Sequence, residues 1–163
     1  MSAFEITEAR VLRPEEGTRV VPIPGAPIVF KAWGKGQAAD YDLAEFFLPS
    51  GLGPRPHRHG THDELFYVLD GEVEFLVGER SALLEPGSVA HIPPNTVHGF
   101  WNPTSETARF LLIATPAGLH QMFEEMASLA TAGNMNPTTM RDLRRKYDTE
   151  EVDTDWGAGK SLK

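Results

Sequence analysis

Short apolar runs separated by glycine and proline dominate the first 115 residues. Many of the runs are rich in β-branched and aromatic residues, and turn formers such as Asp70 and Gly71 stand between them. The runs lie at residues 27–33, 40–48, 64–70, 72–77, 81–85, 88–93, 96–101 and 108–114. No helical stretch separates them, which argues against a βαβ fold. The pattern therefore predicts an antiparallel sandwich or barrel.

A helical period appears only after residue 116. Within residues 117–130, apolar side chains recur at spacings of three and four positions and form one stripe along a helix. The stripe consists of Leu119, Met122, Phe123, Met126 and Leu129. We expect this stripe to pack on the barrel. Residues 133–139 break the helix, and Thr138 is expected to cap a second, short helix with a solvated charged face that runs to about Tyr147.

The remaining tail, residues 148–163, is predicted to be partly disordered, with Trp156 as its anchor. Neither an internal repeat nor a second domain is visible. Residues 1–163 are therefore expected to form a single domain, with a barrel over about 28–114 and a helical segment over about 117–147. This length can bury a core without disulfides.

Composition and charge exclude several classes of function. The chain has 163 residues, a net charge of −8 and no cysteine. The acidic balance argues against nucleic acid or an anionic membrane as a partner. The lack of cysteine excludes disulfides, thiolate nucleophiles and Cys-ligated metal sites. The sequence starts without the apolar core of a secretory signal, and no run is long enough to span a bilayer, so a cytoplasmic location is expected.

Three of the six histidines lie within six positions. If this stretch is a strand, His57 and His59 point to the same face. If the next strand, which opens with Glu64, pairs back antiparallel, its carboxylate faces the same volume, and His98 in a later strand could complete the group. Three imidazoles and one carboxylate would suit one divalent transition metal: Fe, Mn, Ni, Co or Zn. An exposed polar loop is the alternative, but a carboxylate at the head of an apolar run is costly unless it is paired or ligated.

The same residues resemble the two signature motifs of the cupin family. The spacing of the first motif is matched by Gly51, His57, His59, Glu64 and Gly71. The spacing of the second motif is matched by Gly87, Pro93, His98 and Asn102. Asn95 stands where the family usually has glycine. Because asparagine tolerates a left-handed backbone better than most residues, we expect this turn to survive the change.

The resemblance implies an all-β fold, namely a double-stranded β-helix, or cupin jelly-roll barrel, followed by C-terminal helices. It assigns His57, His59, Glu64 and His98 as metal ligands, in agreement with the strand argument. The chain looks like small single-domain bacterial cupins of the quercetin 2,3-dioxygenase-like kind. That likeness implies a metal-dependent dioxygenase, an oxidoreductase acting on a small aromatic or enolic, flavonol-like substrate. It also implies that Glu64 is catalytic and accepts the substrate proton.

Two other classes of function stay open, because a fold does not determine function. One is a non-oxidative cyclase, isomerase or lyase that acts on polyketide-like substrates, with the metal as a Lewis acid. The other is a non-catalytic module that binds a small molecule. Substrate-dependent consumption of O₂ would separate the dioxygenase from the non-oxidative enzyme.

The neighbours of these four residues suggest the character of the substrate. Several apolar residues share the strand parity of Glu64 or His98 and would surround the site. These are Phe66, Val68 and Phe100, with Phe47 and Phe110 as further candidates. Packing of the barrel core is a slightly better explanation for each of them taken singly, but together they suit an aromatic or apolar substrate. No Lys or Arg is clearly placed inside, which makes a phosphate or sugar-nucleotide substrate less attractive.

The other three histidines are expected outside the metal site. His62 is expected in an exposed turn, although a role as a proton shuttle stays open. The strand face of His91 is ambiguous, and His120 at the start of the first helix is expected to contact solvent. Finally, residues 19–33 are rich in β-formers that could extend a partner's sheet, so a homodimer is expected.

Overall fold

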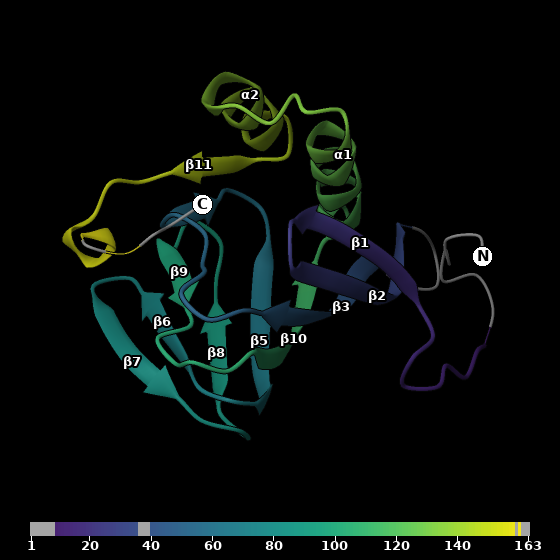
Figure 1. Cartoon of the computed structure of the whole chain (residues 1–163), viewed down its shortest axis with the longest axis horizontal. Coiled ribbons are helices and arrows are strands. Elements are labelled where there is room, and N and C mark those ends of the chain that lie inside the picture. Colours follow the sequence, from purple (N-terminus) through teal and green to yellow (C-terminus); the bar gives the residue numbers. More distant parts are fainter. Residues whose placement is uncertain (1–8, 36–39, 159, 161–163) are drawn as a thin grey trace.

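The computed structural model describes residues 9–35, 40–158 and 160, and it consists of two antiparallel β-sheets and two helices (Figure 1). The first sheet has the strand order β1 (Thr18–Ile23), β2 (Ala26–Lys35), β3 (Asp40–Leu48), β10 (Ala108–Thr115), β5 (Asp63–Asp70) and β8 (Val89–Ile92). The second sheet has the order β11 (Thr149–Glu151), β4 (His57–His59), β9 (His98–Trp101), β6 (Val73–Val77) and β7 (Arg80–Leu84). The predicted all-β jelly-roll barrel with C-terminal helices is therefore confirmed.

All eight predicted strands are present. The structure has three further strands that were not predicted: β1, β4 and β11. β1 pairs with β2 in the chain's own sheet, so this N-terminal stretch already has an intramolecular partner. β4 and β11 have only three residues each and pair with one another. Strands this short carry too few residues for an alternating pattern to identify them. The homodimer and the single-domain organisation both stay predictions.

The space between the two sheets is filled by aromatic rings. Alternate residues of β3, β5 and β10 point inward, as the parity argument requires. The rings pack with centroid separations between 5.1 and 6.3 Å and belong to Phe46, Phe66, Phe75, Phe100 and Phe110. Phe46 rather than Phe47 therefore contributes its ring to this cluster. Phe47 is half-buried, and the Arg109 guanidinium lies 5.9 Å from the centre of its ring.

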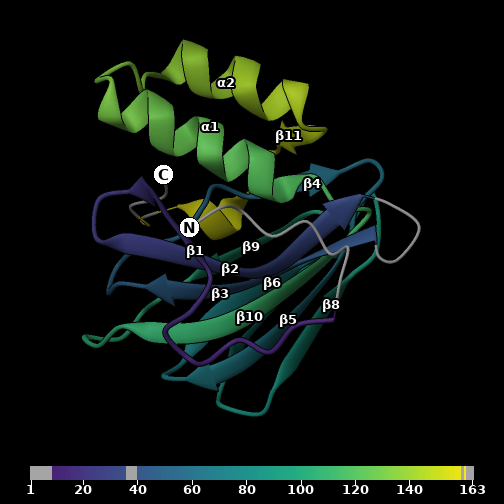
Figure 2. The same ribbon diagram turned by 90° about the vertical axis from the view of Figure 1, so that its right-hand side faces the viewer.

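Helix α1 (Leu119–Thr131) lies against β1, and helix α2 (Pro137–Lys146) lies against β11 (Figure 2). The predicted apolar stripe is confirmed, because its residues Leu119, Met122 and Met126 are buried on the barrel. Neither helix is long and apolar enough to cross a bilayer, and none is found elsewhere in the described residues.

The predicted cap of α2 is wrong. Asn136 caps this helix, and its side-chain oxygen accepts the backbone N–H groups of Thr138 and Thr139. The Thr139 hydroxyl in turn accepts the N–H of Asn136, which completes a capping box. Pro137 takes the first helical position, where its fixed φ angle is favourable, and this moves the start of the helix before Thr138.

The predicted disorder of the tail is wrong for residues 149–157. β11 supplies a hydrogen-bonded neighbour to β4, and the Val152 N–H donates to the Pro56 carbonyl oxygen at 2.9 Å. Trp156 is confirmed as an anchor, because its indole N–H donates to Glu74 Oε1 at 2.8 Å. Local composition predicted disorder because it contains no sign of an open strand edge far away in the sequence. Residues 159 and 161–163 lie outside the described part.

Two loops hold β4 in place. Asn95 has a φ of 65°, so the expected left-handed turn is confirmed, and its N–H donates to the His59 carbonyl oxygen at 2.7 Å. In the loop before β4, the Gly51 N–H donates to the carbonyl oxygen of Asn102, and the Asn102 N–H donates to the carbonyl oxygen of Leu52. The Asn102 side chain is fully buried and donates to the Leu48 carbonyl oxygen, so this motif residue has a structural role.

Gly53 provides a test of this loop packing. An added Cβ atom would fall well inside van der Waals distance of the Phe100 carbonyl oxygen, and backbone cannot move aside as a side chain can. We expect Gly53→Ala to lower the free energy of unfolding by about 3 kcal/mol, the upper end of overpacking costs. Chemical denaturation would measure the change. Gly25→Ala, where the Cβ meets nothing within 4 Å, should cost only about 1 kcal/mol through its positive φ. Equal losses would contradict the packing account.

Candidate metal centre

Three imidazoles converge inside the barrel, as the sequence predicted. His57 and His59 lie on β4, and His98 lies on β9 directly opposite His57 in the strand register. One nitrogen from each ring lies within 4.8 Å of the others, an arrangement that could hold one metal ion. The closest ring centroids, those of His57 and His98, are 4.3 Å apart. The site thus depends on strand pairing between residues about 40 positions apart in the chain.

Hydrogen bonds to the backbone fix the orientation of all three rings. Nδ1–H of His57 donates to the Arg55 carbonyl oxygen at 2.8 Å, and Nδ1–H of His98 donates to the Thr96 carbonyl oxygen at 3.0 Å. Nδ1 of His59 lies 3.3 Å from the Asp148 carbonyl oxygen and 3.1 Å from the Thr149 hydroxyl. Because a carbonyl can only accept, Nδ1 carries the proton and Nε2 keeps its lone pair, which is the tautomer that a metal-binding histidine needs.

Glu64 reaches the same volume, but from the opposite sheet. The predicted antiparallel pairing between the strand that opens with Glu64 and the strand of His57 and His59 is wrong. β5 pairs with β8 and β10, whereas β4 pairs with β9 and β11. Glu64 therefore faces the histidines across the barrel interior, with Oε2 2.9 Å from Nε2 of His98 and 3.6 Å from Nε2 of His59.

The side-chain atoms of Glu64 and His98 that face each other are buried and lack good hydrogen bonds. Glu64 and His98 are 2% and 1% exposed. Glu64 Oε2 and His98 Nε2 are close, but neither atom makes a hydrogen bond of good geometry. Burying lone pairs without a partner is costly, and a cation bound between them would remove that cost. The residues present therefore fit a metal ion.

The pKa shifts favour the protonation state that metal binding requires. Burial, followed by the charges of His98 and His59, lowers the pKa of His57 well below its ordinary value. Burial also lowers the pKa of His59. Burial raises the pKa of Glu64, but the close contact with His98 and the charges of the three imidazoles outweigh it and lower that pKa to about 2. Near neutral pH His57 and His59 are therefore neutral and the Glu64 carboxylate is ionised, so these three side chains offer lone pairs to a cation.

An apolar cavity opens onto this site. It contains about 920 Å³ of space free of atoms, its open mouth included, and His57, His59 and Glu64 form part of its wall. The rest of the wall comes mainly from the β1–β2 hairpin, β3, the loop before β4, and α1. Of the predicted apolar neighbours, Phe47, Phe66 and Phe100 line the cavity, while Val68 and Phe110 are buried in the core.

Two expectations for the other histidines are wrong. His62 is buried rather than exposed, and both of its ring nitrogens lack a hydrogen-bond partner. His120 is mostly buried as well: it stacks on Trp33 and lies 3.1 Å from the buried carboxylate of Asp42. In both cases the cover comes from elements distant in sequence, which a local pattern cannot reveal. His91 is exposed and pairs with Asp63, outside the metal site.

Sequence reasoning missed a charged residue of the cavity wall, Arg144. Arg144 of α2 lines the cavity together with the metal-site residues, although the charges of this helix had been interpreted as a solvated face. Its neighbour Leu143 is the buried apolar residue of α2, and this was the available signal that the helix packs down at that point.

Comparison with known proteins agrees with this fold. Residues 45–114 match the family model described as the cupin domain. Quercetin 2,3-dioxygenase of Bacillus subtilis (strain 168) is 34% identical over 105 residues, which make up 61% of this chain and 31% of that protein. The chain spans less than two thirds of the length of the curated relatives that it matches, from 31% to 63%.

Solved structures show the same barrel. KdgF from Halomonas sp. superimposes with a TM-score of 0.58 at 20% identity, over 70% of this chain and 99% of that one. The polyketide cyclase RemF from Streptomyces resistomycificus gives a TM-score of 0.55 at 23% identity, over 66% of this chain and 79% of that one. At these identities the likeness establishes the fold alone.

Metal content tests the histidine assignment. We expect wild-type protein to hold about one equivalent of a first-row divalent metal, and His98→Ala to hold less than about a tenth of that, since removal of one ligand leaves the others poorly arranged. Elemental analysis by mass spectrometry provides the measurement. His91→Ala is the matched control, because this exposed histidine lies outside the site. Equal metal loss in both variants would refute the assignment.

Thermal stability offers a second test of the same site. A metal that binds only the folded state, at a free concentration 100 times its Kd, adds about 2.7 kcal/mol of stability. For a chain of this size we expect Tm to rise by about 5–10 °C when metal is added to stripped protein. Differential scanning calorimetry would record the shift. A comparable rise in His98→Ala would show that the metal binds elsewhere.

Proposed function

We propose that this protein is a metal-dependent enzyme acting on a small aromatic or enolic substrate. Its residues 45–114 match the cupin domain model. Its metal ligands in this proposal are His57, His59, His98 and Glu64. One observation carries the proposal: three oriented imidazoles and an ionised carboxylate converge at the wall of an apolar cavity. Such a combination suits a ligand that has an apolar body and one coordinating oxygen.

The metal-site residues and the cavity wall have different chemical roles in this proposal. A bound divalent ion would supply Lewis acidity that lowers the pKa of a substrate hydroxyl. The Glu64 carboxylate is ionised at neutral pH and lies beside the imidazoles. We therefore assign it the role of the base that accepts the proton released from that hydroxyl. Phe66, Phe100 and the apolar side of α1 would exclude water and orient the substrate body.

Dioxygen is the co-substrate that we favour. The support comes from the similarity of 105 residues to quercetin 2,3-dioxygenase of Bacillus subtilis. A dioxygenase transfers both atoms of O₂ to its product, so the reaction needs no external reductant. The apolar cavity is also compatible with O₂, which partitions into apolar surroundings.

An oxygen electrode tests this proposal. With protein loaded separately with Fe, Mn, Ni or Co, we expect one O₂ consumed per molecule of a flavonol or related enol converted. Glu64→Gln should lower kcat by about 100-fold or more through loss of the base, with metal content measured in the same samples. Glu72→Gln, an exposed acid outside the cavity, is the control and should match wild type.

The other outcomes have equally definite meanings. Conversion of the substrate without O₂ uptake would replace the dioxygenase with a non-oxidative cyclase, isomerase or lyase. Saturable binding of the flavonol without any conversion, by every metal form, would indicate a binding module instead of an enzyme.

A further inference from the structure

Arg144 is the only lysine or arginine among the described residues that line the metal cavity. Its side chain is 15% exposed, and it shares the cavity wall with His57, His59 and Glu64. Most of the remaining wall is apolar. A guanidinium is costly to bury against apolar surface unless an anion faces it. Its position therefore points to an anionic partner within or beside the cavity.

Arg144 also belongs to a second, polar pocket on the neighbouring surface. That pocket is lined by three further arginines, Arg58, Arg141 and Arg145, and by three acids, Asp148, Glu150 and Glu151. Arg58 pairs with Glu150 at 2.8 Å. Burial, followed by the charge of Arg55, lowers the pKa of Arg144. The four arginines outnumber the three acids by one, so this pocket is slightly positive in a chain whose net charge is −8.

The chain itself supplies one anion, Glu151 of β11, which forms an ion pair with Nη1 of Arg144. The Glu151 side chain is 38% exposed, so it lies nearer to solvent than the guanidinium does. A guanidinium presents five N–H donors in a planar fork, and a carboxylate has two oxygens to accept them. A ligand carboxylate could therefore share the guanidinium with Glu151 or replace it.

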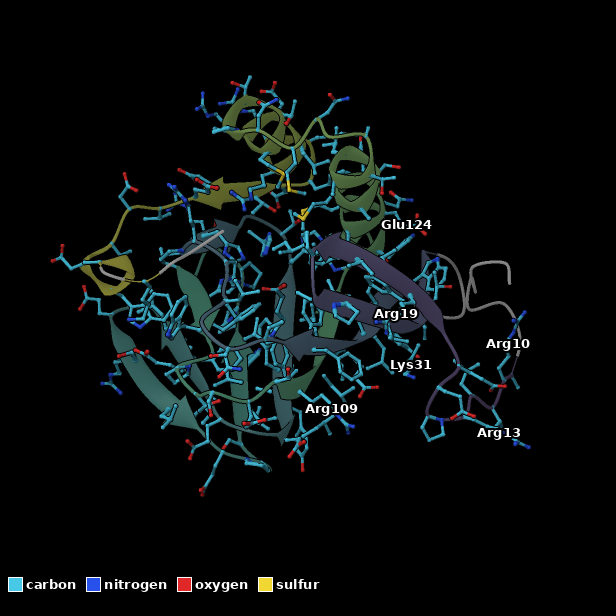
Figure 3. All side chains as sticks on the ribbon, in the orientation of Figure 1. Arg10, Arg13, Arg19, Lys31, Arg109 and Glu124 are labelled. Atoms are coloured by element: carbon cyan, nitrogen blue, oxygen red, sulfur yellow. The ribbon has the colours of Figure 1, made fainter. Side chains whose placement is uncertain are left out.

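The other visible group of cations does not compete for this role. Arg10, Arg13, Arg19, Lys31 and Arg109 lie along the N-terminal segment and on β1, β2 and β10, as labelled in Figure 3. Lys31 and Arg109 are both paired with Glu45. None of these five side chains lines the metal cavity.

We infer that Arg144 is a specificity-determining residue that binds a carboxylate group of the substrate. The inference rests on the function proposed above, since it places the substrate in the metal cavity. The substrate class then becomes narrower: a small aromatic or enolic carboxylate. Its apolar body packs on α1 and the β1–β2 hairpin, its hydroxyl faces the metal site, and its carboxylate meets Arg144.

Binding of two matched probes tests this inference without turnover. 4-Hydroxybenzoate and 4-hydroxybenzamide have the same ring and hydroxyl and differ in the charge of the second group. Titration calorimetry on zinc-loaded protein would give both affinities. We expect wild type to bind the acid at least 10-fold more tightly than the amide, and Arg144→Gln to bind the two within 2-fold of each other.

Two further variants separate recognition from a structural role. Glu151→Gln removes the competing carboxylate, so it should strengthen binding of the acid by several-fold. Arg80→Gln makes the same charge change as Arg144→Gln at an exposed position of β7, outside both pockets, and should leave the ratio unchanged. If Arg144 merely ties α2 to β11, breaking the pair from either side would weaken both probes alike, and the inference would be overturned. Equal affinity of wild type for the two probes would overturn it as well.

The binding test and the oxygen-electrode test fail independently. A preference for the acid that depends on Arg144, found without O₂ uptake on any substrate, would refute the dioxygenase and leave the Arg144 assignment intact. Oxygen uptake with no preference for the acid would refute the Arg144 assignment alone.

Discussion

The hydrogen bonds that orient the three imidazoles are the interactions on which the rest of the site depends. Each ring gives its Nδ1 to polar groups of the backbone or, for His59, also to Thr149, so Nε2 must point into the barrel. β4 has only three residues, and a shift of its register by one would turn His57 and His59 outward. The Asn95 turn on one side and β11 on the other prevent that shift. The candidate metal centre is therefore a product of strand pairing across the fold.

The barrel interior combines two environments with opposite effects on stability. The cluster of phenylalanine rings buries apolar surface and stabilises the fold. Beside it, a carboxylate and three imidazoles are held in a low-dielectric space, which is unfavourable without a cation. Packed aromatic side chains such as Phe66, which contacts both Phe75 and His98, give the polar group a rigid support. A cation bound between these side chains would relieve a cost that folding has already imposed.

Local pattern was sufficient for much of the fold and for identifying the three histidines that the structure brings together. Alternation within strands such as β3 and β10 identified the inward face, and motif spacing singled out the histidines and Glu64. What failed was everything determined by distant pairing. Glu64 comes from the facing sheet, His62 is covered by later elements, and Arg144 reaches the cavity because β11 and α2 fold back over β4. Sequence periodicity reports which side of a strand is buried, but not which partner buries it.

The measurement that tests the central claim most directly is a crystal structure of metal-loaded protein with data collected on both sides of the metal's absorption edge. The account predicts one strong anomalous peak about 2.0–2.2 Å from Nε2 of His57, His59 and His98 and from a Glu64 carboxylate oxygen. A peak bound through Nδ1, a peak at other residues, or no peak in this space under saturating metal would contradict the account.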